Sequence, residues 1–194
     1  MSEDEFVAWC DEKTWAEWVE GEVIVMSPVN AEHAELFDFI YPIFSGFVKF
    51  HRLGVTRAEP YQVRLAAQRR RRAPDMFFVA SHRTNILTKH HAEGPPDLVM
   101  EIVSPDRVAR DWRQKYLEYE SAGVREYWII DPMYERVEAY ALANDGRFRL
   151  IQEQDGVVRS TALSGFFLHP EWPWKRPLPV TFDVLRQLGV VMAS

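Results

Sequence analysis

Two short runs in which apolar and polar residues alternate lie near the start of the chain, in the stretch AEWVEGEVIVMS. Glu20-Gly21-Glu22 separates them, and a tight glycine turn between alternating runs is typical of a β-hairpin. The segment before it, Met1 to Asp11, carries Phe6, Val7 and Trp9 among acidic residues. We expect a short helix there, anchored by these three side chains.

The next apolar positions recur at helical spacing. Asn30 stands where an N-cap residue is expected, and apolar residues follow it at intervals of three and four. Pro42 lies inside this run and should kink the helix without ending it. The apolar positions of this first core helix are Leu36, Phe37, Ile40, Ile43, Phe44, Phe47 and Val48.

The middle of the chain has the pattern of strands. Residues 61–66 alternate in polarity, as in a strand with one solvated face. A basic turn, Arg69 to Arg72, leads into Asp75 to Val79, which is apolar on both faces and predicts a central strand. Asp97 to Val103 predicts a second buried strand, and Glu126 to Asp131 a third.

A second long helix is expected from about Asp106 to Ala122, with Gly123 at its C-terminal end. Its inner stripe consists of Val108, Trp112, Tyr116 and Tyr119. Towards the C-terminus, Val137 to Leu142 and Phe148 to Gln152 predict a β-hairpin around Asn144-Asp145-Gly146. The segment HPEWPWKRPLP, from His169 to Pro179, predicts an irregular extended arm on the domain surface or across a partner, and Val180 to Val191 a short helix.

This order of elements indicates an α/β (α+β) fold with a mixed central β-sheet flanked by helices. The early hairpin and the C-terminal β-hairpin are additions to that core. Neither an internal repeat nor a linker divides the sequence, so we expect a single domain over residues 1–194.

Composition narrows the classes of protein. The chain has 194 residues and a net charge of −6, and its one cysteine, Cys10, excludes an internal disulfide framework. The acidic N-terminus and the lack of a long uninterrupted apolar run argue against a secretory signal or a membrane span. We therefore expect a cytoplasmic protein. The acidic balance is unusual for a nucleic-acid-binding protein.

Candidate chemistry begins at Glu101, an ionisable residue inside an apolar strand, where an unpaired charge would cost several kcal/mol. If the two central strands pair antiparallel, Asp75 faces Glu101 or its neighbour. Two adjacent carboxylates repel unless a proton or a cation lies between them, and Mg²⁺ or Mn²⁺ would suit their oxygens. Asp97 shares a face with Glu101 but lies about 13 Å along the strand, too far to share an ion. Lys115, at the margin of the helical stripe, could direct its ammonium to this pair.

These residues match a known pattern. The chain resembles the PD-(D/E)XK nuclease superfamily, and within it the Uma family of restriction-endonuclease-like proteins, over residues of about 5 to 167. The resemblance rests on four stretches: AEWVEGEVIVMSPVNAEH, APDMFFV, PPDLVMEIVSPD and DWRQKYLEYESAGVREYWIIDP.

The resemblance implies a nuclease core of four mixed strands between two helices, with Asp75 and Glu101 as metal ligands. It also implies that the backbone carbonyl of Ile102 completes the metal site. The lysine of the superfamily normally stands two residues after the glutamate, where this chain has Val103, and Lys115 on the following helix matches the family instead. Residues that the resemblance places at the site wall are Glu17, His33 and, more weakly, Gln62.

Each candidate also has an ordinary structural interpretation. Glu101 could pair with Arg64 or Arg113 without an ion, Asp75 could cap the turn after Ala73-Pro74, and Lys115 could be a solvated helix lysine. In the same way, His33 could be a hydrogen-bonded helix residue, Glu17 a solvated charge, and Lys89-His90-His91 an ordinary loop. The basic turn Arg69, Arg70, Arg71 and Arg72 could be a solubilising turn, or with Arg64 it could bind a phosphate backbone.

The sequence therefore predicts a divalent-metal-dependent endonuclease that hydrolyses phosphodiester bonds, with DNA as its expected partner. The alternative is a non-catalytic nucleic-acid- or protein-binding module on a nuclease scaffold. A homodimer is a further hypothesis, because Tyr140, Phe148 and the arm Trp172-Pro173-Trp174 could offer apolar surface. We expect weak DNA binding without metal and a strong dependence on salt, because the net charge is negative.

Overall fold

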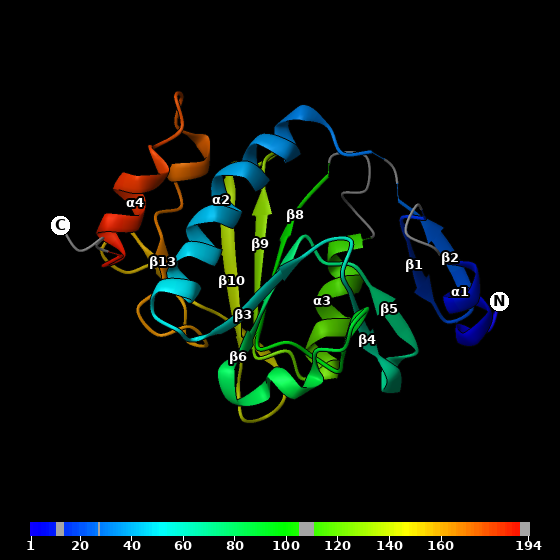
Figure 1. Ribbon diagram of the computed structural model, residues 1–194. Helices are drawn as coiled ribbons and strands as arrows, with labels where there is room; N and C mark the ends of the chain where they lie inside the picture. The colour runs from blue at the N-terminus through cyan, green and yellow to red at the C-terminus, as the bar shows by residue number, and fades with distance from the viewer. Residues whose placement is uncertain (11–13, 27, 105–110, 191–194) are drawn as a thin grey trace.

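The computed structural model describes residues 1–10, 14–26, 28–104 and 111–190, and the side chains from residue 113 within the last range. A six-stranded mixed sheet with the strand order β11-β10-β9-β8-β6-β3 forms its centre (Figure 1). The pairs are antiparallel except for β8 and β9, which run parallel. The strands are β3 (Gly54–Ala58), β6 (Met76–Ala80), β8 (Leu98–Ile102), β9 (Glu126–Asp131), β10 (Arg136–Leu142) and β11 (Phe148–Leu150).

A second, five-stranded sheet with the order β2-β1-β5-β4-β7 lies on the right in Figure 1, beside α1 (Glu3–Trp9). The expected N-terminal hairpin supplies its first two strands. The remaining strands are short, and only one of them, beginning at residue 62, follows the predicted alternation. The bounds are β1 (Ala16–Val19), β2 (Glu22–Val25), β4 (Gln62–Leu65), β5 (Arg70–Arg72) and β7 (His91–Glu93).

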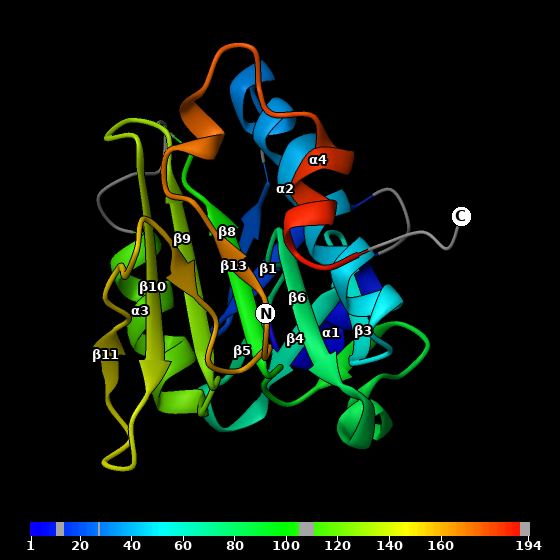
Figure 2. The same ribbon diagram turned by 90° about the vertical axis from the view of Figure 1, so that its left-hand side faces the viewer.

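Two helices cover opposite faces of the six-stranded sheet (Figure 2). The face formed by Met76, Met100 and Trp128 packs against α2 (Ala31–Phe50). The opposite face, which includes Val99 and Tyr127, packs against Tyr119 of α3 (Asp111–Ala122). Alternate residues of each central strand thus pack into two separate hydrophobic cores, one on each face of the sheet. This explains why these strands are apolar on both faces.

The start of α2 is fixed by its predicted N-cap. The Asn30 side chain accepts a hydrogen bond from the His33 backbone N–H at 2.8 Å, and the helix continues through Pro42 as expected. The predicted apolar stripe is buried except for Phe37, which is half-buried. The cap thus fixes the residue at which α2 begins, and with it the position of His33 in the first turn.

The C-terminal segment packs on the domain, which is one of the two placements expected for the arm. Trp172 is buried in the α2-side core, and residues Trp172–Trp174 form a short 3-10 helix, η4. The predicted terminal helix is shorter, as α4 (Thr181–Gln187), and contacts α2. Other short elements are η1 (Ala66–Gln68), η2 (Ser81–Ile86), β12 (Val158–Arg159) and β13 (Phe167–Leu168).

Several expectations need correction. Phe6 is fully buried and anchors α1, but Val7 and Trp9 are each nearly half exposed. Tyr140 and Phe148, expected to offer surface for a dimer, instead pack on Tyr116 with ring centroids 5.0 and 5.2 Å away. The first predicted positions of the long helix, 106–110, and the Trp112 side chain lie outside the described residues. Within the described part of the chain, no helix has both the length and the apolar character to span a membrane.

Candidate active site

Three carboxylates fall in one row across the ends of three adjacent strands. Ala58 pairs with Met76, and Met76 pairs with Met100. One residue further along this register stand Glu59, Asp75 and Glu101 (the acidic row). Directly opposed residues in a sheet share a face and lie close together. The Glu59 backbone N–H donates to the Asp75 carbonyl oxygen at 3.3 Å, which continues the ladder into the row. The two central strands thus pair antiparallel, which is the condition under which Asp75 is expected to face Glu101.

The Asp75 side chain is buried and bonded on both oxygens. Its Oδ2 accepts the Ile102 backbone N–H at 2.5 Å, and its Oδ1 lies 3.3 Å from His33 Nε2. The backbone bond crosses to the neighbouring strand rather than closing the turn after Ala73-Pro74. This geometry argues against a simple turn cap and fixes the direction of the carboxylate.

Glu101 meets two donors from α3. Lys115 Nζ lies 3.1 Å from its Oε2, and the Tyr119 hydroxyl donates to its Oε1 at 2.8 Å. Lys115 is 5% exposed, so the solvated-lysine interpretation is wrong. Burial, followed by the Glu101 charge, raises the pKa of Tyr119 well above its ordinary value, which keeps the hydroxyl protonated as a donor. Arg64, one of the proposed partners of Glu101, pairs instead with Glu3 and Glu93.

Glu17 is also buried, at 2% exposure, and is not a solvated hairpin charge. It accepts the Ala73 backbone N–H at 3.0 Å and an Arg72 bond at 2.6 Å, while its Oε1 lies 3.8 Å from Lys115 Nζ. Burial raises the pKa of Glu17, but the charges of Lys115 and Arg72 and the backbone bond outweigh it, so the pKa is held below the ordinary value.

His33 lies on the other side of Asp75. Burial lowers the pKa of His33, but the hydrogen bond and charge of Asp75, with more distant carboxylates, outweigh this and raise it. Its Nδ1 has no hydrogen-bond partner among the described residues. The structure thus brings together five predicted side chains, which come from β1, α2, β8 and α3 and from the residue directly before β6. They are Glu17, His33, Asp75, Glu101 and Lys115.

Sequence reasoning missed two members of this site. The sequence pattern predicts Tyr119 in the core stripe, although its spacing of four residues from Lys115 places both on one side of the helix. The sequence does not indicate Glu59, because its approach to Asp75 follows from the register of β3 with β6. Burial and the charge of Asp75 raise the pKa of Glu59 to about 7.

The Glu59→Gln variant is expected to stabilise the metal-free protein at about pH 8 and to leave it unchanged at about pH 4. Because the folded-state pKa is raised from 4.5 to about 7, the folding penalty is absent below about pH 4.5, grows between these two values and is complete above about pH 7. The gain is about 2 kcal/mol for a half-buried, partly screened group. Thermal melts in EDTA at both pH values measure it, with exposed Glu153→Gln as control. An equal gain in stability at low pH would mean that changed packing, and not the lost charge, causes the effect.

The donor set fits a hard divalent cation, although no three His, Cys, Asp or Glu side chains among the described residues form a complete metal cage. The acidic row supplies carboxylate oxygens, the ligands that Mg²⁺ and Mn²⁺ prefer. Since the Ile102 N–H points to Asp75, the Ile102 carbonyl faces the same side of its strand. Burial, followed by the Asp75 charge, raises the pKa of Glu59, and a bound cation would offset the second of these causes.

Most of the chain is similar to a known protein family. The model of the Uma2 family, described as "putative restriction endonuclease", matches residues 3–171. The chain belongs to the Uma2 family. The resemblance found in the sequence is thereby confirmed, and the family supports a nuclease-like function.

A solved structure similar to this Uma2 protein is a crystal structure at 1.96 Å resolution, titled a putative nuclease belonging to DUF820 from Anabaena variabilis ATCC 29413. The TM-score is 0.71 at 19% sequence identity, and the match covers 97% of this chain and 99% of the other. The likeness confirms the mixed α/β fold. None of the curated proteins matches the chain.

Two other residues that the sequence analysis names, Gln62 and Asp97, lie outside the candidate site of this Uma2 protein. Gln62 lies in the five-stranded sheet, not beside Asp75, and its Nε2 donates to the Ala16 carbonyl at 3.0 Å. Asp97 is excluded, as expected, because it accepts the Ala80 backbone N–H and pairs with Arg83 and Arg125 at the other end of the strand.

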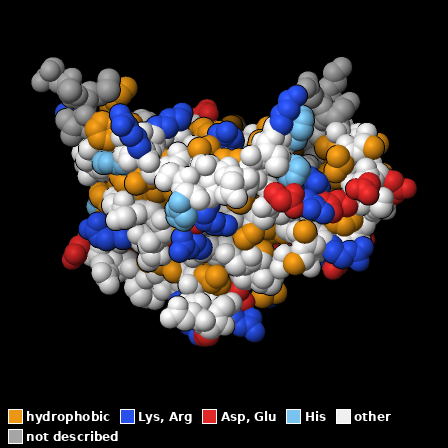
Figure 3. Space-filling model, turned by 60° about the horizontal axis from the view of Figure 1, so that its bottom comes forward, with side chains coloured by type: hydrophobic (Ala, Val, Ile, Leu, Met, Phe, Trp, Pro, Cys, Tyr) orange, Lys and Arg blue, Asp and Glu red, His pale blue; other side chains and the backbone are white. Residues whose placement is uncertain are grey.

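The run Arg69 to Arg72 is not a turn, since its last three residues form β5. Arg71 pairs with Glu3, and Arg70 and Arg72 both pair with Glu118. Their charges are therefore neutralised within the chain, and Arg69 is the exposed member of the run. Basic side chains are also dispersed over the face in Figure 3, while acidic ones gather at its right-hand end. A phosphate-binding role for Arg64 and Arg69–Arg72 stays a prediction.

Proposed function

We propose that this Uma2 protein is a divalent-metal-dependent endonuclease that hydrolyses phosphodiester bonds in DNA. The observation that carries the proposal is that Asp75, Glu101 and Lys115 converge where β6 begins and β8 ends, with Lys115 buried against Glu101. A structural lysine on an amphipathic helix would place its ammonium in water. Here the ammonium of Lys115 and the two carboxylates are kept out of solvent, which supports a catalytic role for them.

Asp75, Glu101 and the Ile102 carbonyl are the groups that would hold Mg²⁺ or Mn²⁺. A bound divalent cation polarises a phosphate and lowers the pKa of a water molecule. The other roles belong to the chain itself. The Ile102 N–H and His33 orient Asp75, the Tyr119 hydroxyl orients Glu101, and the Lys115 ammonium orients the attacking water and offsets negative charge that develops on the phosphate.

The lysine of this chain differs in sequence position from the lysine of the PD-(D/E)XK superfamily, but it lies beside the same glutamate. The usual lysine position on the strand is Val103, which is buried in the α3-side core. Lys115 reaches the same glutamate from the neighbouring helix, 3.1 Å away. We therefore assign Lys115 the role of the displaced superfamily lysine.

Incubation of the purified chain with supercoiled plasmid tests the activity. We expect nicked and linear products with Mg²⁺ or Mn²⁺ and none with EDTA. Cleavage should fall as salt rises, because salt screens the contacts of basic side chains with the phosphate backbone and the net charge of the chain is negative. Single-stranded DNA and RNA of the same sequence, run in parallel, test the DNA assignment. Equal cleavage of RNA would contradict it, and cleavage in EDTA would contradict the metal requirement.

Metal binding separates this function from the alternative of a non-catalytic binding module on the same scaffold. We expect Mn²⁺ to raise the melting temperature of the protein, because a ligand that binds only the folded state stabilises it by about 2.7 kcal/mol at a hundred times its Kd. Glu101→Gln should abolish the shift. A wild-type protein that binds DNA but shows no shift with either metal would favour the binding module.

The homodimer also stays a proposal. Its predicted surfaces are covered within the chain, since Trp172 is 5% and Phe148 is 4% exposed. Light scattering of the purified protein decides it, and a monomeric mass would contradict it.

A further inference from the structure

Lys115 is flanked by two carboxylates. Its Nζ lies 3.1 Å from Glu101 on β8 and 3.8 Å from Glu17 on β1. A lysine ammonium is a point charge on a flexible stem, so its direction depends on what surrounds it. Glu17 is itself held by the Ala73 N–H and by Arg72, and its Oε1 is thereby directed to the ammonium.

Arg72 extends this chain of contacts back to α3. It is 1% exposed and binds both oxygens of Glu118, with Nε at 2.8 Å and the second nitrogen at 2.9 Å. Glu118 lies one helical turn beyond Lys115. The order of charges is therefore Glu118, Arg72, Glu17, Lys115, Glu101, with the sign alternating at every step.

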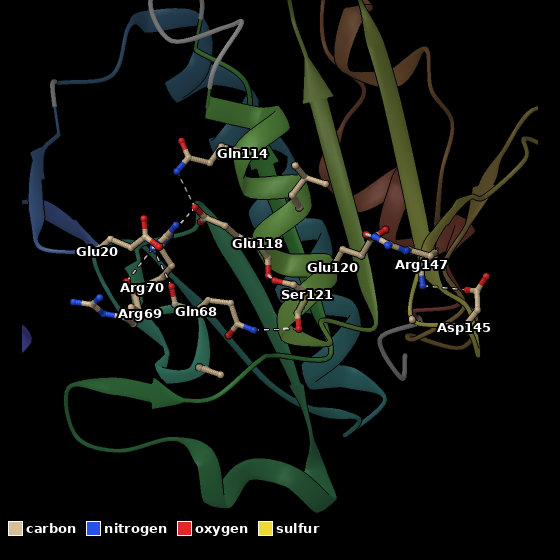
Figure 4. Close-up of a pocket in the computed structure, with 13 residues that line it drawn as sticks. Glu20, Gln68, Arg69, Arg70, Gln114, Glu118, Glu120, Ser121, Asp145 and Arg147 are labelled. Atoms are coloured by element: carbon tan, nitrogen blue, oxygen red, sulfur yellow. Dashed lines mark hydrogen bonds and ion pairs between the residues drawn. The ribbon is translucent and has the colours of Figure 1, made fainter.

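The outer end of this series lies at the surface. Glu118 lines an open hollow of about 810 Å³ between η1, α3 and the turn of the β10–β11 hairpin. There it also accepts bonds from Arg70 at 2.8 Å and Gln114 at 3.0 Å (Figure 4). Both its oxygens are thus occupied, and the orientation of Glu118 is fixed from the solvent side as well.

We propose that Glu17, Arg72 and Glu118 are positioning residues that hold Lys115 against Glu101. The inference rests on the nuclease function proposed above and goes beyond it. It explains how a lysine on α3, instead of on the strand after Glu101, keeps a defined orientation. Buried ion pairs contribute little net stability compared with apolar residues of similar size. A series of them between β1, β5 and α3 is therefore better explained by the orientation it gives than by the stability it adds.

Two size-matched variants, Glu17→Gln and Glu118→Gln, test this proposal with one matched control. Glu120→Gln removes an equally buried carboxylate from the same helix. Glu120 accepts bonds from Arg147 and the Phe148 backbone N–H and lies outside the series. All three changes retain hydrogen-bonding capacity, and thermal melts show that each variant is folded.

The first measurement does not depend on activity. The chain has five lysines, so ¹³C-lysine NMR gives a simple spectrum, in which Lys115 is assigned by the signal lost in Lys115→Arg. We expect the Lys115 Cε signal to shift and its relaxation to show greater motion in Glu17→Gln and Glu118→Gln, but not in Glu120→Gln. An unchanged Lys115 signal in both test variants would overturn the proposal, whether or not the protein cleaves DNA.

The second measurement is a double-mutant cycle on cleavage. Glu17→Gln should lower kcat by about 10- to 100-fold with little change in KM, the usual effect of removing a group that orients a catalytic residue. In the Lys115→Met background it should have no further effect, because Glu17 acts through Lys115. The same loss in both backgrounds would overturn the proposal. Absence of cleavage by the wild type with either metal would contradict the nuclease function and leave the NMR result to decide positioning.

Discussion

Asp75→Asn and Glu101→Gln are each expected to lower the rate of metal-dependent plasmid cleavage by about a thousandfold or more. Each substitution removes a negative charge from the acidic row while preserving side-chain size. Electrostatic stabilisation by a bound cation contributes several kcal/mol to such a reaction, and each 1.4 kcal/mol is about tenfold in rate. The initial rate of nicking, at saturating Mg²⁺ and matched protein concentration, measures the loss.

The matched control is Asp97→Asn. Asp97 is 1% exposed and comes just before the strand that carries Glu101, but its partners are Arg83, Arg125 and the Ala80 N–H. This variant should lose stability and keep its cleavage rate when assayed well below its melting temperature. If cleavage survived in both Asp75→Asn and Glu101→Gln, the site assignment would be wrong. If Asp97→Asn were equally inactive, the loss would reflect folding rather than chemistry.

The central part of the site could be predicted because its residues are conspicuous in local sequence. Glu101 interrupts an apolar strand, and an antiparallel neighbour that begins with Asp75 places a second carboxylate beside it. The N-cap at Asn30 set the position of His33 on its helix. These inferences need only the period of a strand or helix and one pairing, which a single sequence supplies.

The remainder depends on contacts between distant parts of the chain. Arg72 lies in a run of arginines that has the composition of a solvated turn, yet its partners Glu17 and Glu118 are 55 and 46 residues away. Glu59 joins the site only through the register of β3 with β6. The five-stranded sheet escaped prediction for the same reason, since β5 and β7 have three residues each and no apolar alternation.

Arg72→Met is expected to destabilise the fold by about 3–5 kcal/mol, a large share of the stability of an ordinary domain. Arg72 is 1% exposed, and its guanidinium binds Glu17 and Glu118, which are 2% and 6% exposed. Methionine fills much of the volume but leaves both carboxylates without their main partner. Urea denaturation at about pH 7, with free energies extrapolated to zero denaturant, measures the loss.

The pH dependence of that loss identifies its cause. In the wild type, the charge of Arg72 helps to hold the pKa of both Glu17 and Glu118 below the ordinary value, against burial, which raises it. Without Arg72, burial is opposed less and both groups take up protons more readily in the folded state, so the deficit should shrink from about pH 7 to about pH 4. Arg71→Met, which removes a pair with the more exposed Glu3, should cost about 1 kcal/mol or less. A deficit for Arg72→Met that is the same at both pH values would mean that lost packing, rather than two stranded charges, destabilises the variant.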